Sequence, residues 1–415
     1  MKYKSNSSFN YSLAYTVLNT VFPILTIPIV LRIFSSQQYG EYVFVNVVYQ
    51  IFNVLFVLSV QPFFIREFVR KIESGISKTV CLSQNLQLQL CLSLSCAFFY
   101  VVTMLLLIHI NATNMVFLGI FLLPIVFSFM NFEWYFYATQ KYKEVFYRTL
   151  FVKIFVLITL VFFINEENNF IAYVFIMSVS YLLTNIIGFI YVLPHIRPAA
   201  MWKNKINFFD FLIKAKSFIA NSSIGVCYQY VDQLLVGLFL TKGELAALSI
   251  LKQLFNASIM LPSTVCRLWM PISIAKRSST DGLSYIKNNS KRYAILITCI
   301  FVSLIFVGVP ALRFIATSKY SFSIIDVTLC ALCMLVTAFA VFIDTQISIP
   351  NNLEKITTFS NSIVLISFSI SIVPLTLTLG YLGPIASLIL SELFGVLSMS
   401  YMHIFKYKTH IHRYK

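Results

Sequence analysis

Long apolar segments follow one another along almost the whole chain, and they constrain the fold more than any other feature of the sequence. Hydropathy defines about twelve of them, each long enough to cross a hydrocarbon layer about 30 Å thick. Only 11% of the residues are charged, compared with roughly 25% in soluble domains. We therefore expect an all-α polytopic membrane protein. The expected spans cover residues 10–34, 42–64, 86–109, 115–139, 146–164, 170–193, 218–240, 245–270, 293–315, 322–347, 356–379 and 383–405.

The basic residues are divided unevenly between the two sides of these spans. The net charge is +16, and most of the 31 Lys and Arg residues lie on the side that holds both termini. Because cytoplasmic loops are enriched in Lys and Arg, we expect both termini to be cytoplasmic. The expected parts are an N-terminal six-helix lobe at residues 1–193, a cytoplasmic basic linker at 194–217, a C-terminal six-helix lobe at 218–405 and a cytoplasmic tail at 406–415.

Two charged residues flank the tight turn between the seventh and eighth expected spans. Asp232 precedes Thr241 by nine residues, and Lys252 follows Glu244 by eight. At about 1.5 Å per helical residue, both charges lie roughly 12 to 14 Å from the same membrane face. A charge near the middle of a bilayer usually faces a partner or water. We therefore expect Asp232 and Lys252 to face a partner or water inside the bundle.

A polar stripe runs along one face of the eighth expected span. On a helical wheel, Asn256 and Arg267 fall within roughly 60° of Lys252. On the seventh span, Gln229 shares the face of Asp232. Uncharged polar residues in a membrane often serve only to join neighbouring helices, and this alternative stays open for them. The two cations favour a different interpretation, in which this hairpin forms one wall of a water-filled, cationic cavity.

Amide side chains also share one face in each of the first two spans. Asn19 lies on a narrow polar face of the first span, which Pro23 and Pro28 should kink. Asn46, Gln50 and Asn53 cluster on one face of the second span. The first two spans therefore carry polar stripes, as do the seventh and eighth.

Three further charged residues fall inside expected spans. Glu133 and Lys153 lie at similar depth in a hairpin, where they form either a buried structural ion pair or part of a transport site. Glu392 lies near the middle of the last span without a cation close to it in sequence. It is a candidate for a protonatable site, and the alternative is a carboxylate paired for structural reasons.

Sequence signatures of catalysis and of metal binding are absent. The chain has no G-x-x-x-x-G-K-[ST] motif, and its five histidines are scattered. No Ser, Cys or His residue stands in a recognisable nucleophile motif. We therefore expect no catalytic residue, no metal ligand and no cofactor, and we do not expect an enzyme. Energy for transport would then come from an ion gradient, the membrane potential or the substrate gradient.

Two stretches resemble a known family of transporters. The first stretch reads LAYTVLNTVFPILTIPIVLRIFSSQQYGEYVFVNVVYQIFNVL and continues to QPFFIREFVRKI. The second reads YQYVDQLLVGLFLTKGELAALSILKQL. With the twelve-span layout, they resemble Wzx-type O-antigen flippases, which are polysaccharide transporters of the MOP superfamily. The match covers the whole chain in topology and roughly a fifth of it in motif. Many relatives have a different residue after the basic one where Gln253 stands here.

The resemblance implies two six-helix lobes around a central cavity, lined by the four spans that carry polar stripes. It also implies a bacterial inner-membrane protein that flips undecaprenyl-diphosphate-linked oligosaccharide repeat units by alternating access, within membrane lipids and beside other polysaccharide-assembly proteins. Lys252 and Arg267 would bind the diphosphate, the amides would bind sugar hydroxyls, and H⁺ or Na⁺ would drive the cycle. The alternatives are a cation-coupled multidrug exporter of the same superfamily and a membrane oligosaccharide polymerase. The cationic stripe argues against the first, and the short periplasmic loops argue against the second.

Overall fold

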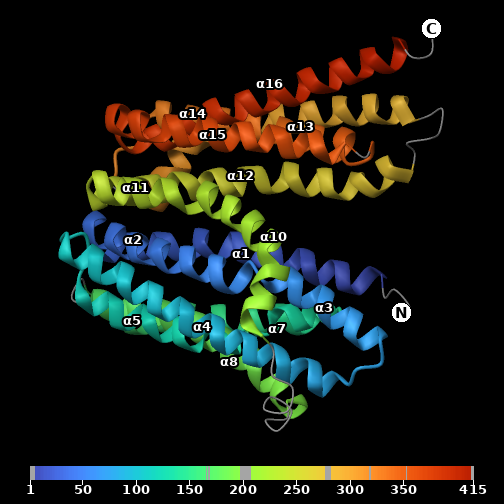
Figure 1. Ribbon diagram of the computed structural model, residues 1–415. Helices are drawn as coiled ribbons and strands as arrows, with labels where there is room; N and C mark the ends of the chain where they lie inside the picture. Colours follow the sequence, from blue (N-terminus) through green and yellow to red (C-terminus); the bar gives the residue numbers. More distant parts are fainter. Residues whose placement is uncertain are drawn as a thin grey trace. The chain divides into compact units, whose positions relative to one another are not determined.

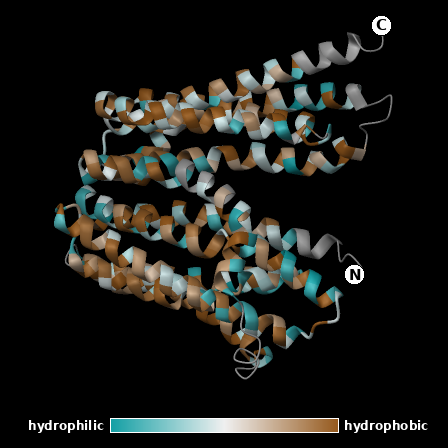
Figure 2. Ribbon diagram, viewed as in Figure 1, coloured by the Kyte–Doolittle hydropathy of each residue, from teal (hydrophilic) through white to brown (hydrophobic). Residues whose placement is uncertain are grey.

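The structure is a computed structural model that describes residues 5–164, 166, 169–196, 207–275, 282–316, 319–351 and 353–412. All regular elements in these ranges are helices, which confirms the all-α prediction (Figure 1). Ten helical segments there are long and apolar enough to cross a membrane. Hydrophobic residues occupy most of their length (Figure 2), as expected for a multi-pass membrane protein.

The ten segments account for eleven of the twelve expected spans. The segment Lys355–Ile404 contains two helices that meet at Gly380, where φ is +61°, a conformation that glycine adopts readily. The remaining expected span, the seventh at 218–240, corresponds to the helical run between Phe208 and Phe239, which is not among the ten. Several helices are also longer than their apolar segments.

The helices form two compact units, Met1–Leu238 and Phe239–Lys415. The expected linker at residues 194–217 falls within the first unit, and its residues 197–206 lie outside the described ranges. The expected lobe boundaries stay a prediction. The first unit contains α1 (Ser5–Ile33), α2 (Ser36–Asn53), η1 (Val54–Leu58), α3 (Gln61–Glu73), α4 (Lys78–His109), α5 (Met115–Val126), η2 (Phe127–Met130), α6 (Glu133–Ala138), α7 (Tyr142–Phe163), α8 (Phe170–Val192), η4 (Leu193–His195), α10 (Phe208–Val226), η5 (Cys227–Val231) and α11 (Asp232–Phe239), which ends at the unit boundary.

The second unit has fewer elements, and its helices are longer. It contains α12 (Lys242–Ala275), α13 (Gly282–Ala316), α14 (Ile324–Ile343), η7 (Asp344–Ser348), α15 (Glu354–Leu379), η8 (Gly380–Leu382) and α16 (Gly383–His412) (Figure 1). Tyr293 of α13 ties two of these helices together, because its hydroxyl donates a 3.0 Å hydrogen bond to the Ala338 carbonyl of α14. Its ring also stacks on Phe342, with 4.9 Å between the centroids.

Several spans are interrupted by short stretches that are not α-helical. The π turn η1 lies between α2 and α3, η5 lies between α10 and α11, and η7 follows α14. The 3₁₀ turn η2 divides the fourth span before Glu133. An interrupted helix leaves backbone groups that neighbouring side chains must satisfy in a bilayer, and π turns are frequent at functional sites. These interruptions therefore mark the places where polar side chains are needed.

Aromatic packing holds three helices of the first unit together at one end. Phe64 of α3 lies 5.6 Å from Trp134 of α6 and 5.8 Å from Phe211 of α10, measured between ring centroids. The side chains of all three residues are buried. Each large aromatic side chain removes about 150 to 250 Å² from water or lipid contact, so this cluster anchors the end of the unit.

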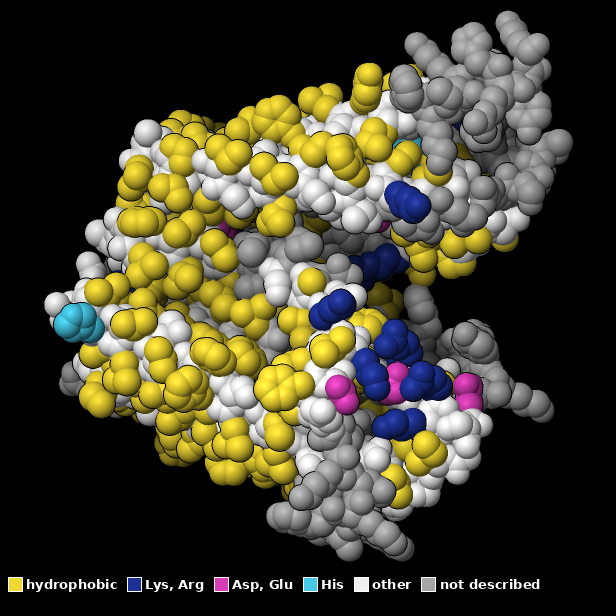
Figure 3. Space-filling model, in the orientation of Figure 1, with side chains coloured by type: hydrophobic (Ala, Val, Ile, Leu, Met, Phe, Trp, Pro, Cys, Tyr) yellow, Lys and Arg dark blue, Asp and Glu magenta, His cyan; other side chains and the backbone are white. Residues whose placement is uncertain are grey.

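The outer surface of the helices is largely apolar. Phe162, Phe306 and Ile370 are each more than 70% exposed, as expected of side chains that contact lipid (Figures 2 and 3). On the face shown in Figure 3, Lys and Arg side chains of the first unit gather beside α3. Arg66 and Arg70 of α3 are exposed there.

Candidate functional site

Two amides predicted to line a cavity meet a tyrosine of α8. The Gln50 Nε2 donates a 3.1 Å hydrogen bond to the Tyr181 hydroxyl, which in turn donates a 3.0 Å bond to Asn46 Oδ1. The Tyr181 ring stacks on Tyr49 of α2, with 4.8 Å between centroids. The structure thus brings Asn46 and Gln50 together, one helical turn apart, through a hydroxyl on another helix. Asn46, Gln50 and Tyr181 are half-buried, and the Tyr49 ring against which Tyr181 stacks is buried.

We predict that Tyr181→Phe destabilises the first unit. The change keeps the ring stacking and removes the hydroxyl that joins Gln50 to Asn46, so two partly buried amides each lose a partner. A lost hydrogen bond of this kind costs about 1 to 3 kcal/mol. Thermal unfolding of the purified protein in detergent measures the effect, with Tyr100→Phe as the control, because the buried Tyr100 hydroxyl has no hydrogen-bond partner in the described part of the chain. Equal melting temperatures for the two variants would contradict the prediction.

Glu133 is the centre of a buried polar cluster at the start of α6. Its Oε2 lies 3.3 Å from Arg148 Nη2, and its Oε1 accepts hydrogen bonds of 3.2 Å from Tyr15 and 2.6 Å from Tyr137. Arg148 is 7% exposed, and Asn19 hydrogen-bonds to Tyr15. The cluster therefore joins α1, α6 and α7 through one carboxylate.

The structure corrects the predicted partner of Glu133. Arg148, one helical turn before Lys153 on α7, forms the ion pair, and the Lys153 ammonium lies 4.2 Å from the centre of the Phe22 ring of α1. Arg148 lies only two residues after the start of the expected span at 146–164, so hydropathy did not single it out as a partner for Glu133. The helix begins at Tyr142, so that Arg148 faces inward. A glutamate at the start of a short helix and an arginine fifteen residues later, in the next helix, are the signal in the sequence for this pair.

Gly188 of α8 makes room for the Arg148 guanidinium. A Cβ at this glycine would lie 2.9 Å from Arg148 Nη1, a distance that real Cβ atoms essentially never show. We predict that Gly188→Ala displaces Arg148, strains the pair with Glu133 and lowers both thermal stability and transport. Gly119→Ala in α5 is the matched control, since nothing lies within 4 Å of its Cβ position. Equal melting temperatures and transport rates for the two variants would refute this placement of Arg148.

Asp232 begins α11, directly after the π turn η5. Its side chain is 0% exposed, and its Oδ1 accepts a 2.7 Å hydrogen bond from the Gln233 amide. Gln229 lies within η5 and is exposed. Asn53, the last residue of α2, also adjoins a π turn and is half-buried. The predicted polar residues of the second and seventh spans thus lie at breaks in their helices.

The predicted residues of the second unit lie along α12 and α16. Lys252 is half-buried on α12, and Asn256 and Arg267 are exposed on the same helix. Glu392 is half-buried in α16, and no ion pair within the described part of the chain includes it. Asp232 belongs to the first unit and Lys252 to the second, so their pairing stays a prediction.

No group of His, Cys, Asp and Glu residues in the described ranges is arranged to hold a metal ion. The polar side chains collected here can instead bind, orient and exchange hydrogen bonds. Amides and tyrosines offer both donors and acceptors, and the lysine and arginines offer a positive charge with several N–H donors. Taken by themselves, the amides of the first unit suit hydroxyl groups, and Lys252 and Arg267 of the second unit suit an anion.

Comparisons with known proteins agree with this description. The model of the family described as "Polysaccharide biosynthesis protein" matches residues 7–274. Among solved structures, the chain is similar to "Lipid II flippase MurJ, inward closed conformation", with 16% sequence identity and a TM-score of 0.67. The similarity covers 95% of this chain and 87% of that chain, and it establishes a common fold. No curated protein matches the sequence.

Proposed function

Because the chain belongs to the polysaccharide biosynthesis protein family, we propose that it flips a lipid-linked oligosaccharide across a bacterial inner membrane. The resemblance to Wzx-type flippases is thereby confirmed at the level of the family. The single observation that carries the proposal is the fold of this chain. Over 95% of its length, the chain shares this fold with a protein named as a lipid II flippase. The proposed substrate is an undecaprenyl-diphosphate-linked O-antigen repeat unit, which moves from the cytoplasmic to the periplasmic leaflet.

The chemistry of the site supports a substrate with an anionic group and sugars. Lys252 and Arg267 lie on one helix and provide the positive charge for a diphosphate. Asn46 and Gln50 provide amides for sugar hydroxyls. We further propose alternating access of the two units, with both termini in the cytoplasm and with coupling to H⁺ or Na⁺ through Asp232 or Glu392. Membrane lipids and other polysaccharide-assembly proteins would surround the transporter.

A strain that lacks this gene tests the proposal. We expect diphosphate-linked repeat units to accumulate on the cytoplasmic leaflet while surface polysaccharide disappears, and we expect the wild-type chain to reverse both changes. Normal surface polysaccharide, together with altered sensitivity to amphipathic drugs, would overturn the proposal. That result would instead support the multidrug exporter of the same superfamily.

A further inference from the structure

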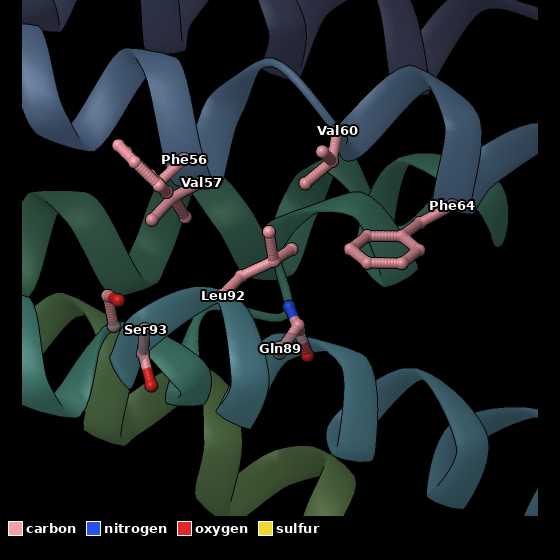
Figure 4. A pocket seen from close by; sticks show the side chains of 8 residues that line it. Phe56, Val57, Val60, Phe64, Gln89, Leu92 and Ser93 are labelled. Carbon is pink, nitrogen blue, oxygen red and sulfur yellow. The ribbon is translucent and has the colours of Figure 1, made fainter. Parts of the chain in front are cut away.

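A small cavity lies inside the first unit, where two interrupted spans approach α4. Phe56, Val57, Val60 and Phe64 lie on one side of it, and Gln89, Leu92 and Ser93 of α4 lie on the other (Figure 4). Ser128 of the 3₁₀ turn η2 completes the lining. The cavity volume is about 10 Å³, which is at the lower limit for one water molecule. The cavity therefore separates the π turn of the second span from the break in the fourth.

Two polar atoms of the lining residues have no hydrogen-bond partner in the described part of the chain. They are Gln89 Oε1 and Ser128 Oγ. The two residues are only 6% and 5% exposed. Buried polar atoms are nearly always hydrogen-bonded to protein or to ordered water, and an unsatisfied one destabilises the fold. The other polar lining residue, Ser93, is satisfied because its hydroxyl donates a 3.0 Å bond to the Leu90 carbonyl.

The orientation of the Gln89 amide is fixed by its other end. Its Nε2 donates a 2.5 Å hydrogen bond to the Asn131 carbonyl. A flipped amide would place Oε1 against that carbonyl, and two acceptors repel each other. The Nε2 group therefore stays on Asn131, and the Oε1 atom needs a donor from elsewhere. Ser128 does not supply it, because no hydrogen bond joins the two residues among those described.

We propose that this cavity binds an ordered water molecule that donates to Gln89 Oε1 and hydrogen-bonds to Ser128 Oγ. Water is the ligand that fits, because the volume admits only a single small molecule. Gln89 Oε1 needs a hydrogen-bond donor, and the Ser128 hydroxyl can either donate or accept, so that one water molecule satisfies both. The site goes beyond the proposed function and does not depend on it. It is a hydration site in an otherwise apolar part of a membrane protein.

The water site is connected to the Glu133 cluster by hydrogen bonds. Gln89 Nε2 donates a hydrogen bond to the Asn131 carbonyl. Asn131 Oδ1 in turn accepts a 3.2 Å hydrogen bond from the Glu133 backbone amide and a 3.3 Å hydrogen bond from Gln61 Nε2. Asn131 thus fastens the start of α6, the helix that presents Glu133. By donating to Gln89 Oε1, the water molecule would satisfy the side chain that holds the Asn131 carbonyl, and it would thereby support the break before Glu133.

X-ray radiolysis in ¹⁸O-labelled water tests the site on the purified full-length protein. Ionised bound water produces hydroxyl radicals that label adjacent side chains, so Phe64 reports on the cavity although it is only 1% exposed. Phe121 of α5, 0% exposed and outside the cavity lining, is the dry control. We expect Phe64 to be labelled several-fold more than Phe121 and to take up ¹⁸O slowly. Equal labelling of the two rings would overturn the proposal.

Two serine variants separate water binding from general loosening of the unit. Ser128→Ala removes one proposed partner of the water and is expected to lower the labelling of Phe64 toward that of Phe121. Ser93→Ala removes a hydroxyl of the same cavity that is already satisfied, and it should leave the labelling unchanged. A loss of labelling in both variants, or in neither, would contradict the assignment. The melting temperature of each variant confirms that it is folded.

Discussion

Replacing Lys252 with alanine is expected to abolish transport while leaving membrane insertion intact. Lys252 is half-buried in the first half of α12, on the face it shares with Asn256 and Arg267. A hydrogen bond between a charged donor and an anion contributes about 1.5 to 3 kcal/mol, so its loss weakens substrate binding roughly 10- to 100-fold. The repeat unit must be held during the whole conformational cycle, and surface polysaccharide should therefore fall to the level of the deletion strain. The Arg267→Ala variant, altered nearer the end of the helix, should weaken transport to a smaller extent.

Two control variants separate the charge of Lys252 from its position. Lys252→Arg keeps a positive charge with N–H donors on the same face, and we expect partial transport. Lys355→Ala removes an identical charge from an exposed position at the start of α15, and we expect normal transport. Surface polysaccharide is measured in the complemented deletion strain, with the amount of each variant in the membrane determined by immunoblot. Normal transport by Lys252→Ala at normal abundance would show that Lys252 does not contact the substrate.

The class of fold follows from the sequence because the bilayer leaves few alternatives. A long apolar segment that must satisfy its own backbone becomes a helix, so the spans could be placed from hydropathy alone. Their ends could not, because an amphipathic extension such as α3 (Gln61–Glu73) is as polar as a loop. The same ambiguity hid Arg148, which lies in the first two turns of α7. Hydropathy averages over a window and does not indicate which way one charged side chain faces.

The sequence predicted which polar residues of the candidate site share a helix face, but not which residues of other helices they contact. A helical wheel placed Asn46 and Gln50 on one face, and the structure confirms that they lie together. The wheel contains no information about the neighbouring helix, so Tyr181, which joins them, was not predicted. The interruptions η1, η5 and η7 were not predicted either, because their sequences VLFVL, CYQYV and DTQIS share no pattern that marks a π turn. The roles of Asp232, Lys252, Arg267 and Glu392 stay predictions.

The ion pair between Glu133 and Arg148 should be the most sensitive element of the first unit to single substitutions. Removing one partner of a buried pair destabilises a protein by about 3 to 5 kcal/mol, because the other charge is left uncompensated. The two single variants are not expected to be equal. Glu133→Gln leaves an arginine that cannot lose its proton in a site that is 7% exposed. Arg148→Met leaves a carboxylate that keeps the Tyr15 and Tyr137 hydroxyls as hydrogen-bond donors.

We therefore predict that Glu133→Gln is less stable than Arg148→Met. The double variant, which carries both changes, should be more stable than Glu133→Gln alone. Thermal unfolding in detergent of the wild type and the three variants provides the double-mutant cycle. Lys153→Met is the control, because it removes a cation from the same helix that lies over Phe22 and does not pair with Glu133 in the structure. Lys153→Met should therefore be more stable than Arg148→Met. If Lys153→Met were the less stable of the two, Lys153, the partner expected from the sequence, would be the partner of Glu133. If the double variant were destabilised by the sum of the single effects, the two residues would act independently, and the cluster would not be what joins α1, α6 and α7.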